Sequence, residues 1–193
     1  NIGFIFQRGS SSDIPNTPFL TNCISDQGAI KPGTTSTSTV APLYLYPETI
    51  TQQTIEQTTE RTPNLNIEIV NQIANKLVLR FTNEKEAKEN TFAPIDLLDY
   101  IYAVLHSPTY REKYKEFLKI DFPRVPYPKK KETFWQLVKL GGEIRQIHLL
   151  ESPTVEKYIT QYPIDGTNEV SKPKYENGKV YINETQFFDN VPE

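Results

Sequence analysis

The sequence predicts an α+β fold with a β-rich N-terminal lobe, a helical region and a C-terminal β-hairpin. Short apolar runs rich in β-branched and aromatic residues come first, which is typical of strands. Two longer segments after residue 94 carry apolar residues at helical spacing, and Asn177-Gly178 joins two apolar runs near the end. We therefore divide the chain into residues 1–93, 94–162 and 163–193, as three parts of one domain.

Three strands are expected in the N-terminal part. They cover Ile2–Arg8, Pro18–Ile24 and Val40–Tyr46. Leucine and tyrosine alternate in the third run, which predicts a strand with two covered faces. Residues 49–62 are rich in Thr and Gln and hold almost no apolar residue, so we expect an exposed loop there.

Helices are predicted to follow. The first begins at Pro63-Asn64 and continues to about Asn75, and Leu77–Phe81 fits either a short strand or an extension of that helix. The strongest pattern runs from Pro94 to Leu118. It is interrupted before Pro108, because a proline disfavours helical backbone in the residue before it.

A proline-rich segment separates this pattern from a second long helix. Residues 121–128 hold three prolines and must be extended, and Lys129–Leu150 then resumes a helical pattern. The Gly141-Gly142 pair inside that helix indicates either a kink or close helix packing. We expect the two long helices to pack together, with Ile101 in the core between them.

The last part of the chain predicts a short helix and a hairpin. The helix covers Pro153–Tyr162, and the hairpin strands are Val170–Tyr175 and Lys179–Ile182. Asn177-Gly178 supplies the positive φ angles that a type I′ turn requires, so this hairpin is the clearest turn signal in the sequence.

Composition indicates a globular protein. The chain has 193 residues and a mass of 22.2 kDa, with 37% hydrophobic and 11% aromatic residues. No apolar run approaches the roughly 20 residues of a membrane-spanning helix, and no signal-peptide pattern opens the chain. A single cysteine excludes an internal disulfide and suits a reducing cytoplasm. The absence of Met and the apolar start at Asn1 suggest a piece of a longer protein.

Charge is unevenly distributed. The net charge is −3, yet eight basic residues stand against three acidic ones between Arg111 and Lys131. Such a basic stripe is compatible with contact to nucleic-acid phosphates. A solvated helix face explains the same stripe, and charge alone favours that interpretation.

The sequence shows no catalytic constellation. His106 and His148 lie 42 residues apart without further ligands at motif spacing, so we predict a helix-capping role for His106 and a core or interface role for His148. Cys23 is expected to be a buried structural thiol. Asp96 and Asp99 are explained by the helix dipole at a helix start. We therefore predict that this chain is not an enzyme by itself.

The order of several segments resembles the C-terminal specificity region of Type ISP restriction–modification enzymes. The segments are PLYLYP (42–47), RTPNLN (61–66), the long run 100–128, Phe134-Trp135, GGEIRQIHLL (141–150) and TQFF (185–188). Such enzymes are large bacterial proteins that carry nuclease, helicase-like ATPase, adenine methyltransferase and target-recognition parts. The resemblance covers the whole chain, which lacks the family's catalytic motifs.

The resemblance implies a DNA target-recognition domain, in which residues 1–93 form the recognition lobe and 94–162 couple it to a methyltransferase domain of the same parent chain. The implied partner is duplex DNA, in the cytoplasm, without a membrane. S-adenosylmethionine, ATP and Mg²⁺ are implied for the parent protein, and no cofactor is expected in this chain. The domain would position a target adenine for catalysis.

Two sets of residues are candidates for DNA contact. Base reading needs short polar groups and arginine on loops, and phosphate binding needs cations on a firm scaffold. The base-reading candidates are Gln7, Arg8, Ser10, Ser11, Ser12 and Lys31. The phosphate candidates are Lys113, Arg124, Lys129, Lys130 and Lys131.

Two alternatives remain open at this point. The basic stripe could dock a protein partner without direct DNA contact, and a salt-insensitive affinity would favour that hypothesis. The chain could also be an enzyme whose carboxylates assemble only in the fold, in which case a pocket lined by several carboxyl groups of perturbed pKa is expected.

Overall fold

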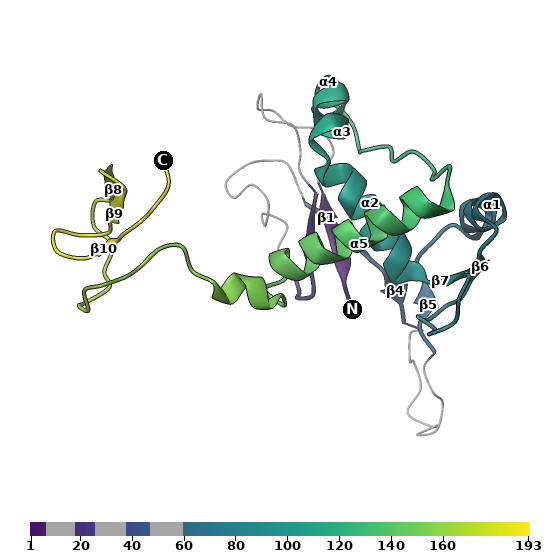
Figure 1. The fold of residues 1–193 in the computed structure, drawn as a ribbon, viewed down its shortest axis with the longest axis horizontal. Helices are drawn as coiled ribbons and strands as arrows, with labels where there is room; N and C mark the ends of the chain where they lie inside the picture. Colours follow the sequence, from purple (N-terminus) through teal and green to yellow (C-terminus); the bar gives the residue numbers. More distant parts are fainter. Residues whose placement is uncertain (7–17, 26–37, 47–59) are drawn as a thin grey trace. The chain divides into compact units, whose positions relative to one another are not determined.

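A computed structural model describes residues 1–6, 18–25, 38–46 and 60–193 (Figure 1). The chain divides into two compact units, Asn1–Glu151 (unit 1) and Ser152–Glu193 (unit 2). The described residues form helices and several small sheets, so the predicted α+β class is confirmed. The tripartite division at residues 93 and 162 stays a prediction.

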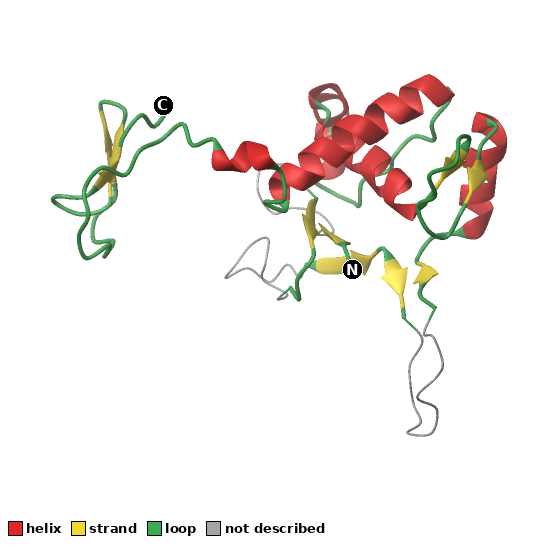
Figure 2. Ribbon diagram, turned by 60° about the horizontal axis from the view of Figure 1, so that its bottom comes forward, coloured by secondary structure: helices red, strands yellow, loops and turns green. Residues whose placement is uncertain are grey.

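Unit 1 begins with a three-stranded antiparallel sheet in the order β2-β1-β3. Its strands are β1 (Gly3–Phe6), β2 (Phe19–Thr21) and β3 (Thr39–Pro42), and a second pair consists of β4 (Tyr44–Leu45) and β5 (Thr62–Pro63). Figure 2 shows β1–β3 beside the long helices of this unit. The two covered faces predicted for Val40–Tyr46 are wrong. Leu43 and Tyr44 are buried, whereas Val40, Leu45 and Tyr46 are exposed, because the chain changes sheets within this segment.

Helix α1 (Ile67–Leu77) starts later than Pro63, where it was predicted. Thr62 and Pro63 pair with β4, so the helix cannot begin before the chain leaves that strand. Asn66 then caps the helix, because its side-chain oxygen accepts hydrogen bonds from the backbone N–H groups of Glu68 and Ile69, at 3.0 and 3.2 Å.

A left-handed residue ends α1 and turns the chain into a strand. Val78 adopts a φ of 53°, and its N–H bonds carbonyls of the last helical turn. Strand β6 (Arg80–Phe81) follows and pairs in parallel with β7 (Thr91–Phe92). Of the two interpretations of Leu77–Phe81, the short strand is therefore correct, and the charged residues 83–90 form the loop between β6 and β7.

The strongest predicted helix is divided into three. They are α2 (Pro94–His106), α3 (Pro108–Lys113) and α4 (Lys115–Leu118). Ser107 ends α2 with extended backbone and caps α3, which places the break directly before Pro108 as predicted. Residues 122–130 contain neither helix nor strand, in agreement with the proline-rich segment, and α5 (Lys131–His148) follows.

Close packing of α2 against α5 forms the centre of unit 1. A Cβ atom on Gly141 would lie 1.8 Å from the backbone oxygen of Asp99, so the two helix backbones touch at this position. Next to it, Arg145 forms a bidentate ion pair with Asp99 at 2.7 and 3.1 Å. The glycine pair therefore serves close helix packing, which is one of the two roles that the sequence left open.

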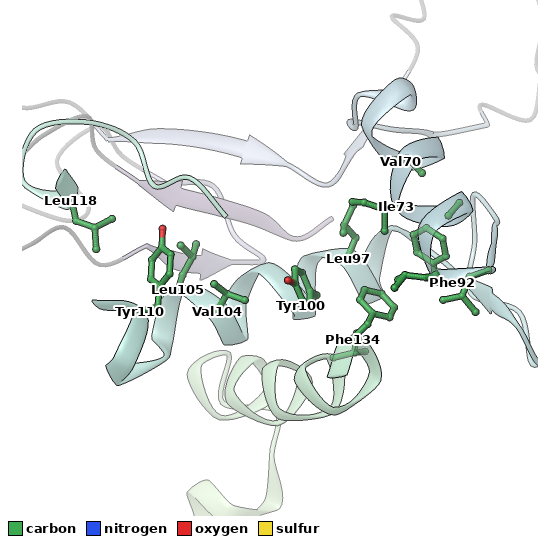
Figure 3. Close-up of a cluster of buried hydrophobic side chains, with 14 residues drawn as sticks. Val70, Ile73, Phe92, Leu97, Tyr100, Val104, Leu105, Tyr110, Leu118 and Phe134 are labelled. Carbon is green, nitrogen blue, oxygen red and sulfur yellow. The ribbon is translucent and has the colours of Figure 1, made fainter. Parts of the chain in front are cut away.

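The core of unit 1 joins α1, the β6–β7 pair, α2 and α5 (Figure 3). Phe92 and Phe134 are almost completely buried and meet edge to face, with ring centroids 5.8 Å apart. A second cluster, around Leu98 and Tyr102, packs α2 against Leu20 and the β4 region. Ile101 is only partly buried at the margin of the core, so its predicted central place is wrong.

Unit 2 is organised around a polar side chain. Gln186 is 1% exposed, and its amide group bonds Asn183, Ile164 and Asn168 at 2.8 to 3.3 Å. The sheet has the order β10-β9-β8, with β8 (Lys174–Glu176), β9 (Lys179–Tyr181) and β10 (Phe187–Phe188).

The predicted hairpin is confirmed, and the predicted helix before it is wrong. Asn177 and Gly178 connect β8 and β9 with φ angles of 52° and 76°, as a type I′ turn requires. A single 3₁₀ turn covers Pro153–Glu156. The chain cannot continue as a helix to Tyr162, because Gln161 pairs with Asp189 as a β-bridge.

Within the part of the chain that the structure describes, no helix combines the length and apolar character that crossing a membrane requires.

Candidate nucleic-acid interface

The six base-reading candidates, Gln7, Arg8, Ser10, Ser11, Ser12 and Lys31, lie outside the described residues. Their role stays a prediction. The sheet register indicates where their segments join the fold, because Phe6 lies opposite Thr39, and Ile5 lies opposite Phe19. The C-terminal end of β1 and the first residues of β2 and β3 therefore lie at the same end of the sheet.

The five phosphate candidates are all described and lie on three different elements of unit 1. Lys113 ends α3, Arg124 belongs to the extended segment, and Lys129, Lys130 and Lys131 lead into α5. Four of these side chains are exposed, and Lys131 is partly buried. Cations that project from helix ends and from a proline-stiffened segment have the firm scaffold that phosphate binding needs.

Lys131, the last of the three consecutive lysines, contacts the loop between β6 and β7. The ammonium group of Lys131 donates a hydrogen bond to the side-chain oxygen of Asn90, 41 residues away in sequence. Both border a polar hollow of about 520 Å³ that is also lined by Lys85, Lys88 and Trp135. The positive end of the α5 dipole adds to this charge, since no side chain at the N-cap position accepts a hydrogen bond from the first N–H groups of the helix.

Ion pairs balance part of the charge in that hollow. The ammonium of Lys85 bonds the buried carboxylate of Asp96, and Lys88 pairs with Glu86 at 3.0 Å. The three consecutive lysines at the start of α5 are not in an ion pair within the described residues. Glu86 and Glu89 also line the hollow, so its charge is mixed.

Arg124 borders a different, aromatic hollow of about 400 Å³, and Lys113 lies against Tyr114, one of the rings that line it. Arg124 lines it directly together with Tyr110, Tyr114 and Phe117. The guanidinium carbon of Arg124 lies 5.2 Å from the centre of the Phe117 ring, and the ammonium of Lys113 lies 5.4 Å from that of Tyr114. These distances are within the reach of cation–π attraction.

The fold therefore separates the phosphate candidates into two groups. Lys113 lies in α3 and Arg124 near the start of the extended segment, whereas the three lysines lie where that segment enters α5. Lys129 follows Arg124 by five residue positions, which in extended backbone is a span on the order of 15 Å. A duplex could contact both groups at once, since successive phosphates of one strand follow its backbone over such distances.

The structure adds residues that the sequence analysis missed. The polar hollow next to Lys131 is also lined by Lys85, Lys88 and Trp135. The aromatic hollow next to Arg124 is also lined by Tyr114 and Phe117. Lys85 and Lys88 stand in a loop whose charges nearly balance in the sequence, so no local signal marked them. The rings next to Lys113 were visible in the run YREKYKEF, and aromatic residues interleaved with basic ones could have indicated them.

The two histidines, far apart in sequence, meet around Tyr102. His106 and His148 have ring centroids 5.2 Å apart, and the Tyr102 hydroxyl shares a hydrogen bond with His148 Nδ1. His148 is exposed overall, so of the two predicted roles the core role is wrong, whereas its contacts with Tyr102 and His106 on α2 agree with the interface role. His106 bonds the carbonyl of Pro18 at 3.2 Å instead of capping its own helix, and burial lowers its pKa.

The remaining polar candidates also differ from expectation. Cys23 is exposed, which contradicts the predicted buried thiol. Asp96 accepts a hydrogen bond from the N–H of Ala93 at the start of α2, as its helix-start role requires. Asp99 is held by Arg145, and burial raises its pKa against the lowering effect of that guanidinium. Because this carboxyl lies in a helix interface and not in a hollow, it gives no support to an enzyme.

Comparisons with known proteins found similar folds and one matching family model. Two solved structures share the fold over 99% of this chain. The first, "cryoEM structure DrdV-DNA complex", has 18% identity and a TM-score of 0.66. The second is a nuclease-deletion mutant of the Type ISP restriction-modification enzyme LlaGI in complex with a DNA substrate mimic, with 21% identity and a TM-score of 0.58.

The present chain spans 18% and 15% of the lengths of those two chains. No curated protein sequence matches it significantly. The model of the Type ISP C-terminal specificity domain matches residues 1–193, from the first strand to the last residue of unit 2. The resemblance noted in the sequence is thus confirmed, and the chain belongs to the Type ISP C-terminal specificity domain family.

Proposed function

We propose that this domain recognises a specific sequence of duplex DNA within a bacterial restriction–modification methyltransferase and positions the target adenine for a catalytic domain of the same polypeptide. Family membership and the fold shared with chains determined as DNA complexes support the proposal. The proposed location is the cytoplasm.

One observation carries the proposal furthest. Three consecutive lysines enter α5 at a point where Pro128 is buried behind them and Asn90 holds Lys131 in place. Cations held in this way can replace the counterions condensed on DNA, which provides sequence-independent affinity and orients the domain on the duplex. In this proposal, base reading belongs to Gln7, Arg8, Ser10–Ser12 and Lys31.

The parent polypeptide is proposed to use S-adenosylmethionine, ATP and Mg²⁺ in other parts of its chain. Among the residues that the structure describes, no cluster of three or more His, Cys, Asp and Glu side chains could hold a metal ion. In this proposal, catalysis belongs to those other parts of the parent polypeptide.

The experiment measures duplex binding by the full-length protein at several salt concentrations. Changing Lys129, Lys130 and Lys131 together to Ala is expected to weaken target and random duplexes alike. The slope of log affinity against log salt concentration should fall by about 0.9 for each phosphate that the variant no longer neutralises. Changing Arg8 to Ala should instead cost about 1–3 kcal/mol on the target duplex alone.

A matched control removes the same charge elsewhere. Lys76, Lys139 and Lys157 are exposed residues outside both hollows, so their joint change to Ala tests for a general effect of net charge. A second variant, Lys129→Ala with Lys130→Ala, leaves the bond from Lys131 to Asn90 intact. Unchanged affinity and salt slope in both lysine variants would refute the proposed phosphate contacts.

The second candidate function is a protein-docking domain without direct DNA contact. It is favoured by an apolar hollow of about 560 Å³ between the N-terminal sheet, α2 and the extended segment, where Phe4, Phe6 and Phe122 contribute to the lining. Apolar hollows of this size commonly receive a ligand or partner side chain. Under this alternative, duplex binding would be absent and partner affinity would be insensitive to salt.

A further inference from the structure

The aromatic hollow beside α3 and α4 has a composition that phosphate contact alone does not require. Three rings surround it, contributed by Tyr110, Tyr114 and Phe117, and the extended segment closes it with Arg124 and Val125. The Tyr110 and Tyr114 rings stand 4.9 Å apart at an angle of 46°. Simple charge neutralisation would need the cations and none of the rings.

The floor of this hollow is firmly held. Tyr110 is 8% exposed, and its hydroxyl donates a hydrogen bond to the carbonyl of Arg124 at 2.9 Å. Tyr100 likewise bonds the carbonyl of Pro126 at 2.8 Å, and Val125 packs against the main core. A binding site on such a scaffold needs little reorganisation when a ligand enters.

The rim, in contrast, is open and positively charged. Tyr114 is 39% exposed, and the side chain of Arg124 is 80% exposed. Arg124 approaches Asp121 only to 3.9 Å, and Lys113 is not in an ion pair within the described residues. Exposed rings with cations beside them are the combination by which proteins hold unpaired bases of nucleic acids.

The volume also suits such a ligand. About 400 Å³ falls at the lower end of the range of about 300–1,000 Å³ that is usual for small-ligand pockets. A single planar ring system with an attached phosphate matches aromatic walls and a cationic rim. A paired base inside an intact duplex could not enter, because its faces are covered by its neighbours in the stack.

We propose that this hollow holds one unpaired nucleobase of a DNA strand against Tyr114 and Phe117, while Arg124 and Lys113 contact the phosphates on either side of it. The inference rests on the proposed function, since the base must belong to DNA bound by this domain. Besides the phosphate contacts of the proposed function, the domain would thus make a stacking contact with a base that has left the helical stack.

The test compares two DNA probes with the full-length protein. One is a closed duplex, and the other is the same duplex with a single bulged 2-aminopurine, whose fluorescence falls when the base stacks on an aromatic ring. The wild-type protein is expected to bind the bulged duplex more tightly, by about 5- to 150-fold, and to quench its fluorescence. Changing Tyr114 and Phe117 together to Ala should abolish both the preference and the quenching.

Two controls keep this test specific. Tyr175 in unit 2 is 44% exposed and lies outside the hollow, so Tyr175→Ala should change neither measurement. Tyr114→Phe keeps the ring and should retain the preference. Thermal unfolding of each variant shows whether the fold is intact, and Tyr114→Ala alone provides a milder variant if the double change unfolds the protein.

Each outcome decides between the hypotheses. Equal wild-type affinity for both duplexes without quenching overturns the base-binding inference and leaves the proposed function standing, whereas no binding to either duplex overturns both. Retention of the preference by the double variant places the base elsewhere and also overturns the inference. Competition by a ten-residue polyproline peptide that depends on Tyr114 and Phe117 would show that the hollow binds peptide instead.

Discussion

Gly141→Ala tests whether direct backbone contact between α2 and α5 stabilises unit 1. The added Cβ would lie 1.8 Å from the carbonyl oxygen of Asp99, where an ordinary contact needs at least 3.4 Å, so the helices must separate by about 1.6 Å. The obstacle is backbone and cannot rotate away. Overpacking of this kind costs about 1–3 kcal/mol and sometimes more, and a separation of this size belongs at the upper end.

The neighbouring glycine provides a matched control. A Cβ on Gly142 would lie 3.1 Å from the carboxylate oxygen of Asp99, which is a side-chain atom that can shift. Alanine is the better helix former by about 1 kcal/mol, and this gain applies to both substitutions. We therefore expect a net loss of about 2 kcal/mol or more for Gly141→Ala and a change within about 1 kcal/mol for Gly142→Ala.

Urea unfolding measures both variants. Trp135 is the only tryptophan of the chain and lies on α5, so its fluorescence reports on unit 1 independently of unit 2. The transition midpoint should fall for Gly141→Ala without a change in slope, as expected when stability alone is altered. Equal midpoints for the two variants would refute the argument that the helix backbones touch at Gly141.

Three further predictions concern unit 1. Arg145→Met should cost about 3–5 kcal/mol in urea unfolding, because it leaves the buried carboxylate of Asp99 without its partner; a loss below about 1 kcal/mol would show that the pair is dispensable. Leu98→Ala, at a site 2% exposed, should lower the free energy of unfolding by about 2–5 kcal/mol. Ile101→Ala should lower it by less, because that side chain is only partly buried. A larger loss for Ile101→Ala than for Leu98→Ala in the same assay would contradict the observed core. Burial lowers the pKa of His106, so the unfolded chain takes up a proton that the folded chain does not, and stability should fall as the pH drops below about 6.5. His106→Gln should reduce that slope in thermal unfolding between pH 7.5 and 5, and an unchanged slope would assign it to other groups.

Sequence and structure agree best at the chain's turns and breaks. The hairpin turn at Asn177-Gly178, the break before Pro108 and the extended segment 122–130 all follow from the backbone chemistry of the residues themselves. Proline and glycine restrict or extend the allowed φ angles regardless of distant contacts. The sequence by itself therefore determined where the elements turn, and the order of its segments was sufficient to indicate the family.

The tertiary structure alone decided what these elements contact. It joined Lys131 to Asn90 across 41 residues, brought His106 to His148, and assigned Gly141 to close packing and not to a kink. It also replaced the predicted helix beyond Glu156 by a β-bridge at Gln161. Local propensity contributes at most about 1 kcal/mol per residue, so pairing and burial with distant residues override it. The grouping of cations and rings into two hollows depends on such long-range contacts, and it became visible only in the folded chain.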